Sequence, residues 1–256
     1  MDDPGTGHGL LAGKTVLVTA AAGTGIGYAT AERCVAEGAI VAISDRHERR
    51  LGEAAERLAG PAGGKPLAIP CDGTVQDQVD HLIDTAAAEL GRIDVLVNNV
   101  GLGGTASVID MTDEQWGSVI DTTLTATFRA TRAVLRHMVP RRAGVIVNNA
   151  SVLGWRAQAG QAHYAAAKAG VMALTRCAAM DVAEYGIRVN AVSPSIAMHP
   201  FLAKVTTDDA LAELTSREAF GRAAQPWEVA NVIVFLASDY SSYMTGEVVS
   251  VSSQHP

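Results

Sequence analysis

Residues 14–38 read KTVLVTAAAGTGIGYATAERCVAEG, and they carry the strongest structural signal in this 256-residue chain. The first six residues, 14–19, are mostly apolar and β-branched, which is typical of a buried strand. A glycine-rich turn at 20–27 follows, and the alanine-rich remainder has helical spacing. A strand, a glycine turn and a helix in this order form the context that a phosphate-binding fingerprint requires. The stretch therefore predicts the first strand–helix unit of a nucleotide-binding α/β domain.

The glycines of this turn suit the pyrophosphate of a dinucleotide. Gly23, Gly25 and Gly27 permit a tight turn and a close approach of the backbone. The N–H groups at the start of the following helix, near Thr24 and Ile26, would then face the phosphates. Most isolated glycine clusters are only turns, so this motif needs support from the rest of the chain.

A second strand-like run, 39–44 (AIVAIS), leads into Asp45, twenty residues after Gly25. At that distance an acid reaches the hydroxyls of an adenosine ribose. A carboxylate there attracts a free diol and repels a 2′-phosphate, so we expect NAD(H) to be favoured over NADP(H). Arg46, the next residue, would soften that preference and is expected to contact the cofactor as well.

Apolar, strand-like runs alternate with helical segments along the whole chain. We expect strands at about 15–19, 39–44, 67–71, 93–98, 143–149, 187–192 and 246–251. We expect helices at 26–37, 47–59, 75–90, 111–137, 161–184 and 226–237. The alternation predicts a single α/β domain over residues 1–256, with a doubly wound, Rossmann-like, seven-stranded parallel sheet and helices on both faces. Ligands of such sheets bind at the carboxyl ends of the strands.

A second motif, HYAAAKAG, places Tyr164 and Lys168 four residues apart, with Ser151 thirteen residues before the tyrosine. A free phenol ionises near pH ~10, which is too high for a general acid/base at neutral pH. A lysine at i+4 shares a helix face with the tyrosine, and its positive charge is expected to lower the pKa of the phenol. Ser151 would hold the substrate oxygen. The alternative is a solvated Tyr/Lys pair, since this spacing alone is common.

With these motifs in place, the chain resembles the short-chain dehydrogenase/reductase family from about residue 11 to residue 250. The motifs that carry the resemblance, in family order, are AAAGTGIG (20–27), CDG (71–73), NNVG (98–101), Ser151 with YAAAK (164–168), NAVSPS (190–195) and YMTGEVVSV (243–251). The resemblance implies reversible ketone/alcohol interconversion with a nicotinamide cofactor. A closer resemblance, to actinobacterial reductases of steroid-ring breakdown that act on a hydroxy/keto indane acid carried as a coenzyme A thioester, rests on 44–53, 148–158 and 250–256.

The resemblance also implies roles for single residues. Ser151 polarises the substrate oxygen, Tyr164 donates the proton, and Lys168 binds the nicotinamide ribose. The expected cofactor contacts are Gly23, Thr24, Gly25, Ile26, Gly27, Asp45, Arg46, Asp72, Gly73, Asn99, Gly101, Tyr164, Lys168, Pro194 and Ile196. The NNVG motif also has a structural interpretation, because in the family it braces the central sheet.

Three departures from the family pattern stand out. Thr123 aligns with a catalytic asparagine that ordinarily anchors a water near the lysine. Thr123 either holds such a water through its hydroxyl or merely packs in the long helix. Ala20 replaces the first glycine of a glycine loop that is one residue longer than usual. Ser252 and Ser253 replace the usual aspartate/glycine ending.

The composition excludes several classes of protein. A hydrophobic content of 48% with 18% charged residues excludes disorder, and the net charge of −7 argues against a nucleic-acid surface. Cys34, Cys71 and Cys177 have spacings that fit neither a disulfide framework nor a zinc site, so we expect reduced packing residues. The histidines lack ligand spacing, and we expect no metal. With no secretory leader and no membrane-spanning run, a cytoplasmic protein is expected.

The segments between the motifs are expected to define the substrate and the assembly. Residues 195–220 occupy the position of the family's substrate lid, and they mix apolar and charged residues. Residues 155–163 give an unusually polar lining, in which Arg156 could meet a carboxylate or the phosphates of a thioester carrier. An arginine paired with a surface neighbour is as good an interpretation. The helix around 164–183 is apolar on more than one face, which predicts a homodimer or homotetramer. A helix that is deeply covered within a monomer is the alternative.

These observations lead to one main functional hypothesis and two alternatives. We expect an NAD(H)-dependent oxidoreductase that interconverts a secondary alcohol and a ketone on a hydrophobic, cyclic acid or acyl-CoA substrate. A 3-oxoacyl-thioester reductase of fatty-acid type would use the same side chains on a linear chain. A non-catalytic NAD-binding protein is the third hypothesis, and the intact Ser151, Tyr164 and Lys168 argue against it.

Overall fold

The computed structural model describes residues 7–59, 64–198, 215–216 and 218–253. Its sheet has seven strands in the order β3-β2-β1-β4-β5-β6-β7, and every neighbouring pair is parallel. The strands are β1 (Thr15–Thr19), β2 (Ile40–Asp45), β3 (Leu67–Pro70), β4 (Val95–Asn98), β5 (Gly144–Asn149), β6 (Ile187–Pro194) and β7 (Val248–Val251). The expected doubly wound sheet is confirmed, and each predicted strand end lies within two residues of the observed one.

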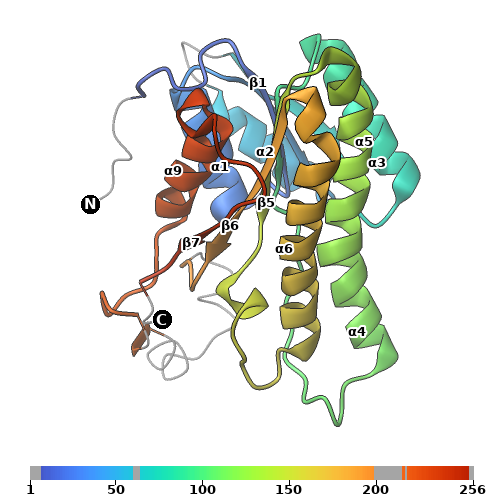
Figure 1. Ribbon diagram of the computed structural model, residues 1–256, viewed down its shortest axis with the longest axis vertical. Coiled ribbons are helices and arrows are strands. Elements are labelled where there is room, and N and C mark those ends of the chain that lie inside the picture. The colour runs from blue at the N-terminus through green and yellow to red at the C-terminus, as the bar shows by residue number, and fades with distance from the viewer. Residues whose placement is uncertain (1–6, 60–63, 199–214, 217, 254–256) are drawn as a thin grey trace.

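Helices connect the strands and cover the sheet on both sides (Figure 1). The α-helices are α1 (Ile26–Ala36), α2 (Glu48–Leu58), α3 (Gln76–Leu90), α4 (Asp113–Ile120), α5 (Ala126–Arg141), α6 (Ala162–Val182) and α9 (Pro226–Ala237). Short 3₁₀ turns are η2 (Val152–Gly154), η3 (Ala183–Tyr185) and η4 (Asp239–Ser241). In the described part of the chain, no helix is both long and apolar enough to cross a membrane.

Successive side chains of a central strand pack into hydrophobic cores on opposite faces of the sheet. Val16 and Val18 of β1 point into a cluster with α1, α2 and α9, whereas Leu17 between them points into a cluster with α3, α5 and α6. All three side chains are fully buried. A strand that is buried on both faces reads as a continuous apolar run, which is why residues 15–19 show no polar alternation.

The segment that sequence analysis treated as one helix, 111–137, is interrupted. A π-helical turn, η1 (Asp121–Thr125), lies between α4 and α5. The helical spacing of the sequence does not separate this turn from the α-helices on either side. π-Helical turns occur often at functional sites, and Thr123 lies inside this one.

Candidate functional site

The glycine turn joins β1 to α1 as expected, and its geometry fits a phosphate group. Gly25 is the N-cap of α1; it offers no side-chain cap, and no acidic residue lies in the first turn. The N–H groups of that turn are therefore available to an anion. A Cβ at Gly27 would overlap the carbonyl oxygen of Ala20 and the side-chain nitrogen of Asn99. Ala20 itself has a φ of 53°, a left-handed conformation that explains why a glycine is usual at this position.

A cation from α2 supports this turn. The guanidinium of Arg57 donates a hydrogen bond of 3.1 Å to the carbonyl oxygen of Gly23. The same guanidinium lies over the ring of Tyr28, 4.6 Å from its centroid. The stacking fixes a positive charge beside the turn in which the predicted pyrophosphate site lies. Sequence analysis did not single out Arg57, because only the packing of α2 on α1 brings it there.

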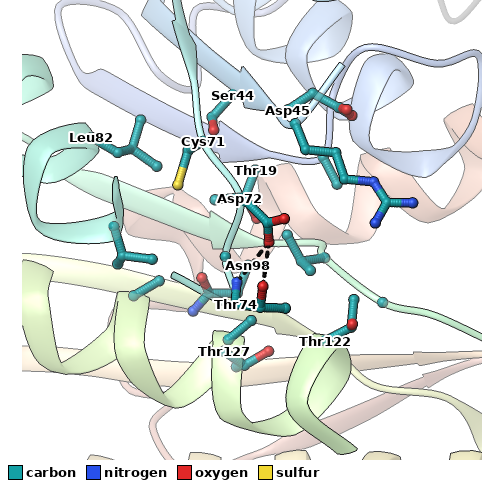
Figure 2. A pocket seen from close by; sticks show the side chains of 18 of the residues that line it. Thr19, Ser44, Asp45, Cys71, Asp72, Thr74, Leu82, Asn98, Thr122 and Thr127 are labelled. Carbon is teal, nitrogen blue, oxygen red and sulfur yellow. Dashed lines mark hydrogen bonds between the residues drawn. The ribbon is translucent and has the colours of Figure 1, made fainter. Parts of the chain in front are cut away.

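A cleft of about 880 Å³, open solvent included, lies next to the turn at the carboxyl ends of β1, β2, β3 and β4 (Figure 2). It contains Asp45, Arg46, Asp72, Gly73 and Gly101, five of the expected cofactor contacts. The further lining residues are Thr19, Ala20, Ser44, His47, Cys71, Thr74, Val79, Leu82, Asn98, Val100, Leu102, Thr122, Ala126, Thr127 and Ala130. The strand ends thus meet where the topology predicts a ligand, at the switch point between β1 and β4.

The two acids of the cleft have different electrostatic environments. Burial raises the pKa of the Asp45 carboxyl, and the N–H of Ala22 together with the charges of Arg50 and Arg46 opposes that rise. Asp72 accepts hydrogen bonds from the hydroxyl and the N–H of Thr74, at 2.7 and 2.9 Å, as Figure 2 shows. These bonds lower the pKa of Asp72. Both carboxylates are therefore positioned by backbone N–H groups and can accept further bonds from a ligand.

The far wall of the cleft comes from small side chains that sequence analysis missed. Thr122, Ala126 and Ala130 line it from η1 and α5. They recur every four residues, so a stripe of small residues on one helix face was the available signal. A Cβ at Gly73 would lie 3.0 Å from the Cβ of Ala126, which shows how closely the turn after β3 approaches this helix.

The NNVG motif (98–101) braces the central sheet, as its structural interpretation predicts. The side-chain nitrogen of Asn98 donates to Asn148 at 2.9 Å and to Thr131 at 3.1 Å. Asn148 donates in turn to Thr175 at 2.9 Å. This buried chain of amides and hydroxyls ties β4 and β5 to α5 and α6. Asn98 is therefore a structural residue even though it also borders the cleft.

Ser151, Tyr164 and Lys168 come together as expected. Ser151 follows β5 and caps η2, and its hydroxyl is close enough to the phenol of Tyr164 to act on the pKa of that group. The ammonium of Lys168 lies 5.6 Å from the centroid of the Tyr164 ring, one helical turn away on α6. Lys168 is 3% exposed, and its ammonium donates a hydrogen bond of 2.6 Å to the carbonyl oxygen of Asn149. A solvated Tyr/Lys pair is therefore excluded.

Burial sets the direction of the pKa shifts of Tyr164 and Lys168. Burial raises the pKa of the Tyr164 phenol above its ordinary value, and the hydrogen bond with Ser151 opposes the rise. Burial also lowers the pKa of Lys168, from 10.5 to about 8. Low polarity disfavours the charged form of both groups.

Thr123 is fully buried and braces a loop. Its hydroxyl accepts a hydrogen bond of 3.0 Å from the N–H of Leu102 and donates one of 3.3 Å to the carbonyl oxygen of Leu102. Both hydrogen-bonding functions are thus used within the protein. Of the two roles considered for this residue, packing and bracing is the one that the contacts favour.

The substrate side of the site is bounded by the loop after β4 and by the start of α6. Gln161 donates to the carbonyl oxygen of Gly104 at 2.7 Å and to Thr105 at 3.2 Å. His163 is buried, and its Nδ1 accepts a hydrogen bond from the N–H of Tyr164, which agrees with its exclusion from catalysis. Trp155 is 51% exposed beside this wall.

Only the two ends of the expected lid, 195–220, can be described, because 199–214 and 217 lie outside the described residues. Pro194 ends β6, and the carbonyl oxygen of Ile196 accepts from the N–H of Ala224 at 2.9 Å. Near the other end, the hydroxyl of Ser253 donates to the carboxylate of Glu218 at 2.8 Å. Ser253 therefore ties the C-terminal edge to the lid segment.

The expectations for cysteines and metals can be tested on the described residues. Cys34 and Cys71 are buried, and burial raises their pKa values to about 12 and about 11, so both thiols are protonated and inert. Cys177 is exposed, and its expected packing role within the chain was wrong, because it lies on the outer face of α6. The described residues contain no group of three or more potential ligands that could hold a metal ion.

Comparisons with known proteins give the same picture as the geometry. Residues 20–253 match the family model described as enoyl-(acyl carrier protein) reductase. The chain is 65% identical to the (5R,7aS)-5-hydroxy-7a-methyl-1-oxo-2,3,5,6,7,7a-hexahydro-1H-indene-carboxyl-CoA reductase of Mycobacterium tuberculosis, over 98% of this chain and 96% of that protein. It is 40% identical to the 3-oxoacyl-[acyl-carrier-protein] reductase of Thermotoga maritima, over 94% and 97% of the two chains.

A solved structure agrees in fold and in sequence. A short chain dehydrogenase from Mycobacterium smegmatis is 60% identical and superposes with a TM-score of 0.87, over 98% of this chain and 96% of that one. These similarities extend across the nucleotide turn, the cleft and the Ser151–Tyr164–Lys168 trio. The chain belongs to the short-chain dehydrogenase/reductase family, and it is an oxidoreductase of the kind that uses NAD(H) or NADP(H).

Proposed function

We propose that this oxidoreductase interconverts a ketone and a secondary alcohol on a bicyclic hydroxy/keto indane acid carried as a coenzyme A thioester, with NAD(H) as cofactor, in steroid-ring breakdown. The observation that carries the reaction is the contact between the buried ammonium of Lys168 and the ring of Tyr164, one helical turn apart on α6, with the Ser151 hydroxyl acting on the phenol. The substrate class is supported by the 65% identity to a reductase named for such a thioester.

Ser151, Tyr164 and Lys168 each have a distinct role in the proposed reaction. A nicotinamide dinucleotide, when bound, supplies or accepts the hydride. In the reducing direction the Ser151 hydroxyl orients the carbonyl oxygen, and Tyr164 donates its proton to that oxygen as the alcohol forms. Burial raises the pKa of Tyr164, so the phenol carries its proton at neutral pH. Lys168 holds a ribose hydroxyl and, with a pKa of about 8, can return a proton to the tyrosine.

The preference for NAD(H) rests on Asp45. Its carboxylate is fixed by the N–H groups of His47, at 3.0 Å, and Ala22, at 3.4 Å, and it lines the cleft beside the glycine turn. A ribose diol would donate to this carboxylate, whereas a 2′-phosphate would be repelled by it. Arg46 and Arg50 contribute positive charge nearby and limit that repulsion.

We also propose that the chain pairs with a second copy of itself through the outer faces of α5 and α6. A groove between these helices is lined by Phe128, Leu135, Val139, Leu174 and Tyr185 among others. Phe128 is 41% exposed, and Met180, on the outer face of α6, is 79% exposed. An apolar face of this kind is costly in water, and a two-fold pair would cover it. Size-exclusion chromatography with light scattering tests the pairing, and a monomer at micromolar concentration would contradict it.

The 3-oxoacyl-thioester reductase activity is the second candidate, and the 40% identity to such an enzyme favours it. The purified protein should therefore be assayed at 340 nm with NADH and NADPH against three substrates: the keto indane-carboxyl-CoA, acetoacetyl-CoA, and the keto indane acid without coenzyme A. We expect the bicyclic thioester with NADH to give the highest kcat/KM, by at least tenfold. A higher value with acetoacetyl-CoA would replace the proposed substrate with the linear one.

A further inference from the structure

Asn149 is the residue through which the lysine and the glycine turn are connected. It ends β5, two residues before Ser151. Its carbonyl oxygen accepts the 2.6 Å hydrogen bond from the Lys168 ammonium. Its side-chain nitrogen donates at 2.8 Å to the side-chain oxygen of Asn99. Asn99 in turn donates to the carbonyl oxygen of Ala20 at 3.2 Å. One residue thus touches the groups that hold both halves of the expected dinucleotide site.

The hydrogen bonds fix which way the Asn149 amide points. The carbonyl oxygen of Ala20 can only accept, so Asn99 must present its nitrogen there. The remaining side-chain atom of Asn99 is its oxygen, which also can only accept. Asn149 must therefore present its nitrogen to Asn99, and its own Oδ1 is directed elsewhere. The orientation follows from the donors and acceptors of the chain and from no other assumption.

The side-chain oxygen of Asn149 has no hydrogen-bond donor within the described part of the chain. Oδ1 of Asn149 is a buried atom, and it accepts no hydrogen bond from any residue that the structure describes. A buried amide oxygen without a donor is unfavourable, and native proteins seldom retain one that has no task. The neighbouring Asn148, on the opposite face of the same strand, has partners on both sides of its side chain. The contrast points to a ligand at Asn149.

We propose that Asn149 is a cofactor-positioning residue whose Oδ1 accepts a hydrogen bond from the nicotinamide half of the bound dinucleotide. The donors of that half are its ribose hydroxyls and its carboxamide N–H₂, and both would satisfy a neutral amide oxygen. The location supports this half of the molecule, because the Lys168 ammonium is held by the same residue, whereas the adenosine cleft does not include Asn149. The inference rests on the dinucleotide site and not on the identity of the reduced substrate.

Equilibrium titration of the purified protein with three probes tests this role. NADH carries both halves, ADP-ribose lacks the nicotinamide ring but keeps its ribose, and AMP occupies only the adenosine end. The test variant is Asn149→Leu, which keeps the branched shape of the side chain but removes both polar atoms; Asn149→Ala serves if the leucine variant is insoluble. Asn148→Leu is the matched control, because it removes a buried amide from the same strand but leaves Lys168 and Asn99 untouched.

For Asn149→Leu we expect the Kd of NADH to rise about tenfold while the Kd of AMP stays within twofold of wild type. A parallel rise for ADP-ribose assigns the donor to the ribose, and an unchanged ADP-ribose affinity assigns it to the carboxamide. Asn148→Leu should lower the melting temperature without changing the ratio of the NADH and AMP affinities. An unchanged NADH affinity, an equal loss for all three probes, or the same NADH-specific loss in Asn148→Leu would overturn the proposal. Turnover is not measured, so a wrong substrate assignment leaves this result intact.

Discussion

The two ends of the site differ in how far their charged groups are exposed to water. At the adenosine end, Asp45 and Asp72 are partly exposed and accept hydrogen bonds from backbone N–H groups. At the catalytic end, Lys168 is only 3% exposed and has lost most of its hydration. Thr74 lowers the pKa of Asp72, so that acid stays charged. Burial instead moves Lys168 and Tyr164 towards their neutral forms. One end therefore keeps its charge for affinity, and at the other end burial brings the pKa of Lys168 to about 8, where this group can exchange a proton near neutral pH. Affinity and chemistry should be separable by mutation.

We expect the largest change from Tyr164→Phe, which should lower turnover without weakening cofactor binding. Removal of the phenol hydroxyl deletes the general acid, which typically contributes about 10²–10⁴-fold to a rate. We expect kcat to fall by about 10³-fold or more, with the Kd of NADH within about threefold of wild type. Steady-state kinetics and a titration measure the two quantities. A rate near that of wild type would mean that another group donates the proton.

Asp45→Ala tests cofactor selection at the adenosine end of the site. The variant loses the expected bonds to the ribose diol and the repulsion of a 2′-phosphate. Hydrogen bonds to charged groups are worth about 1.5–3 kcal/mol, which corresponds to roughly 10–100-fold in kcat/KM for NADH. The ratio of kcat/KM for NADPH to that for NADH should rise by at least tenfold, with little change in kcat at saturating cofactor. If the ratio does not move, Asp45 is not the residue that selects the cofactor.

Lys168→Met is expected to lower activity and, at pH 7, to raise the free energy of unfolding. The buried ammonium has a pKa of about 8 in the fold, against a model value of 10.5, so the unfolded chain binds more protons between these pH values. Raising the pH from 8 to 10 should therefore stabilise the wild type relative to the variant, by up to roughly 3 kcal/mol at about 1.4 kcal/mol per pKa unit.

The measurement for Lys168→Met is urea unfolding at pH 7, 8, 9 and 10. At pH 7 the variant should be the more stable protein, less whatever the lost hydrogen bond to Asn149 contributes. The difference should shrink as the pH rises. Parallel pH profiles for the two proteins would show that the ammonium is hydrated in the fold and that burial does not set its pKa.

The smallest expected effect is that of Thr123→Val. The substitution is nearly isosteric and removes the two hydrogen bonds with Leu102, so we expect a loss of about 1 kcal/mol in the free energy of unfolding. The pH profile of kcat should be unaltered, because the hydroxyl braces a loop and does not relay a proton. A displaced alkaline limb in the variant would instead place Thr123 in the proton path.

Much of the fold was readable from the sequence because local pattern and tertiary structure agree. The strand at 15–19 was predicted with its observed bounds, because its interior residues are apolar on both faces of the sheet. The π-helical turn at Asp121–Thr125 was not predicted, because helical spacing in the sequence does not separate it from the α-helices on either side. Cys177 was placed inside the protein, since apolar spacing does not tell a face that packs on the sheet from one that faces outward.

The sequence by itself determined the order of strands and helices, the glycine turn, and the presence of a serine, a tyrosine and a lysine with catalytic spacing. These features depend on neighbours within a few residues, so the residue types alone express them. Only the tertiary structure decided the direction of the Tyr164 pKa shift, the engaged hydroxyl of Thr123 and the unsatisfied oxygen of Asn149. Each of these depends on burial and on partners from distant segments, and both exist only once the sheet and its helices have come together.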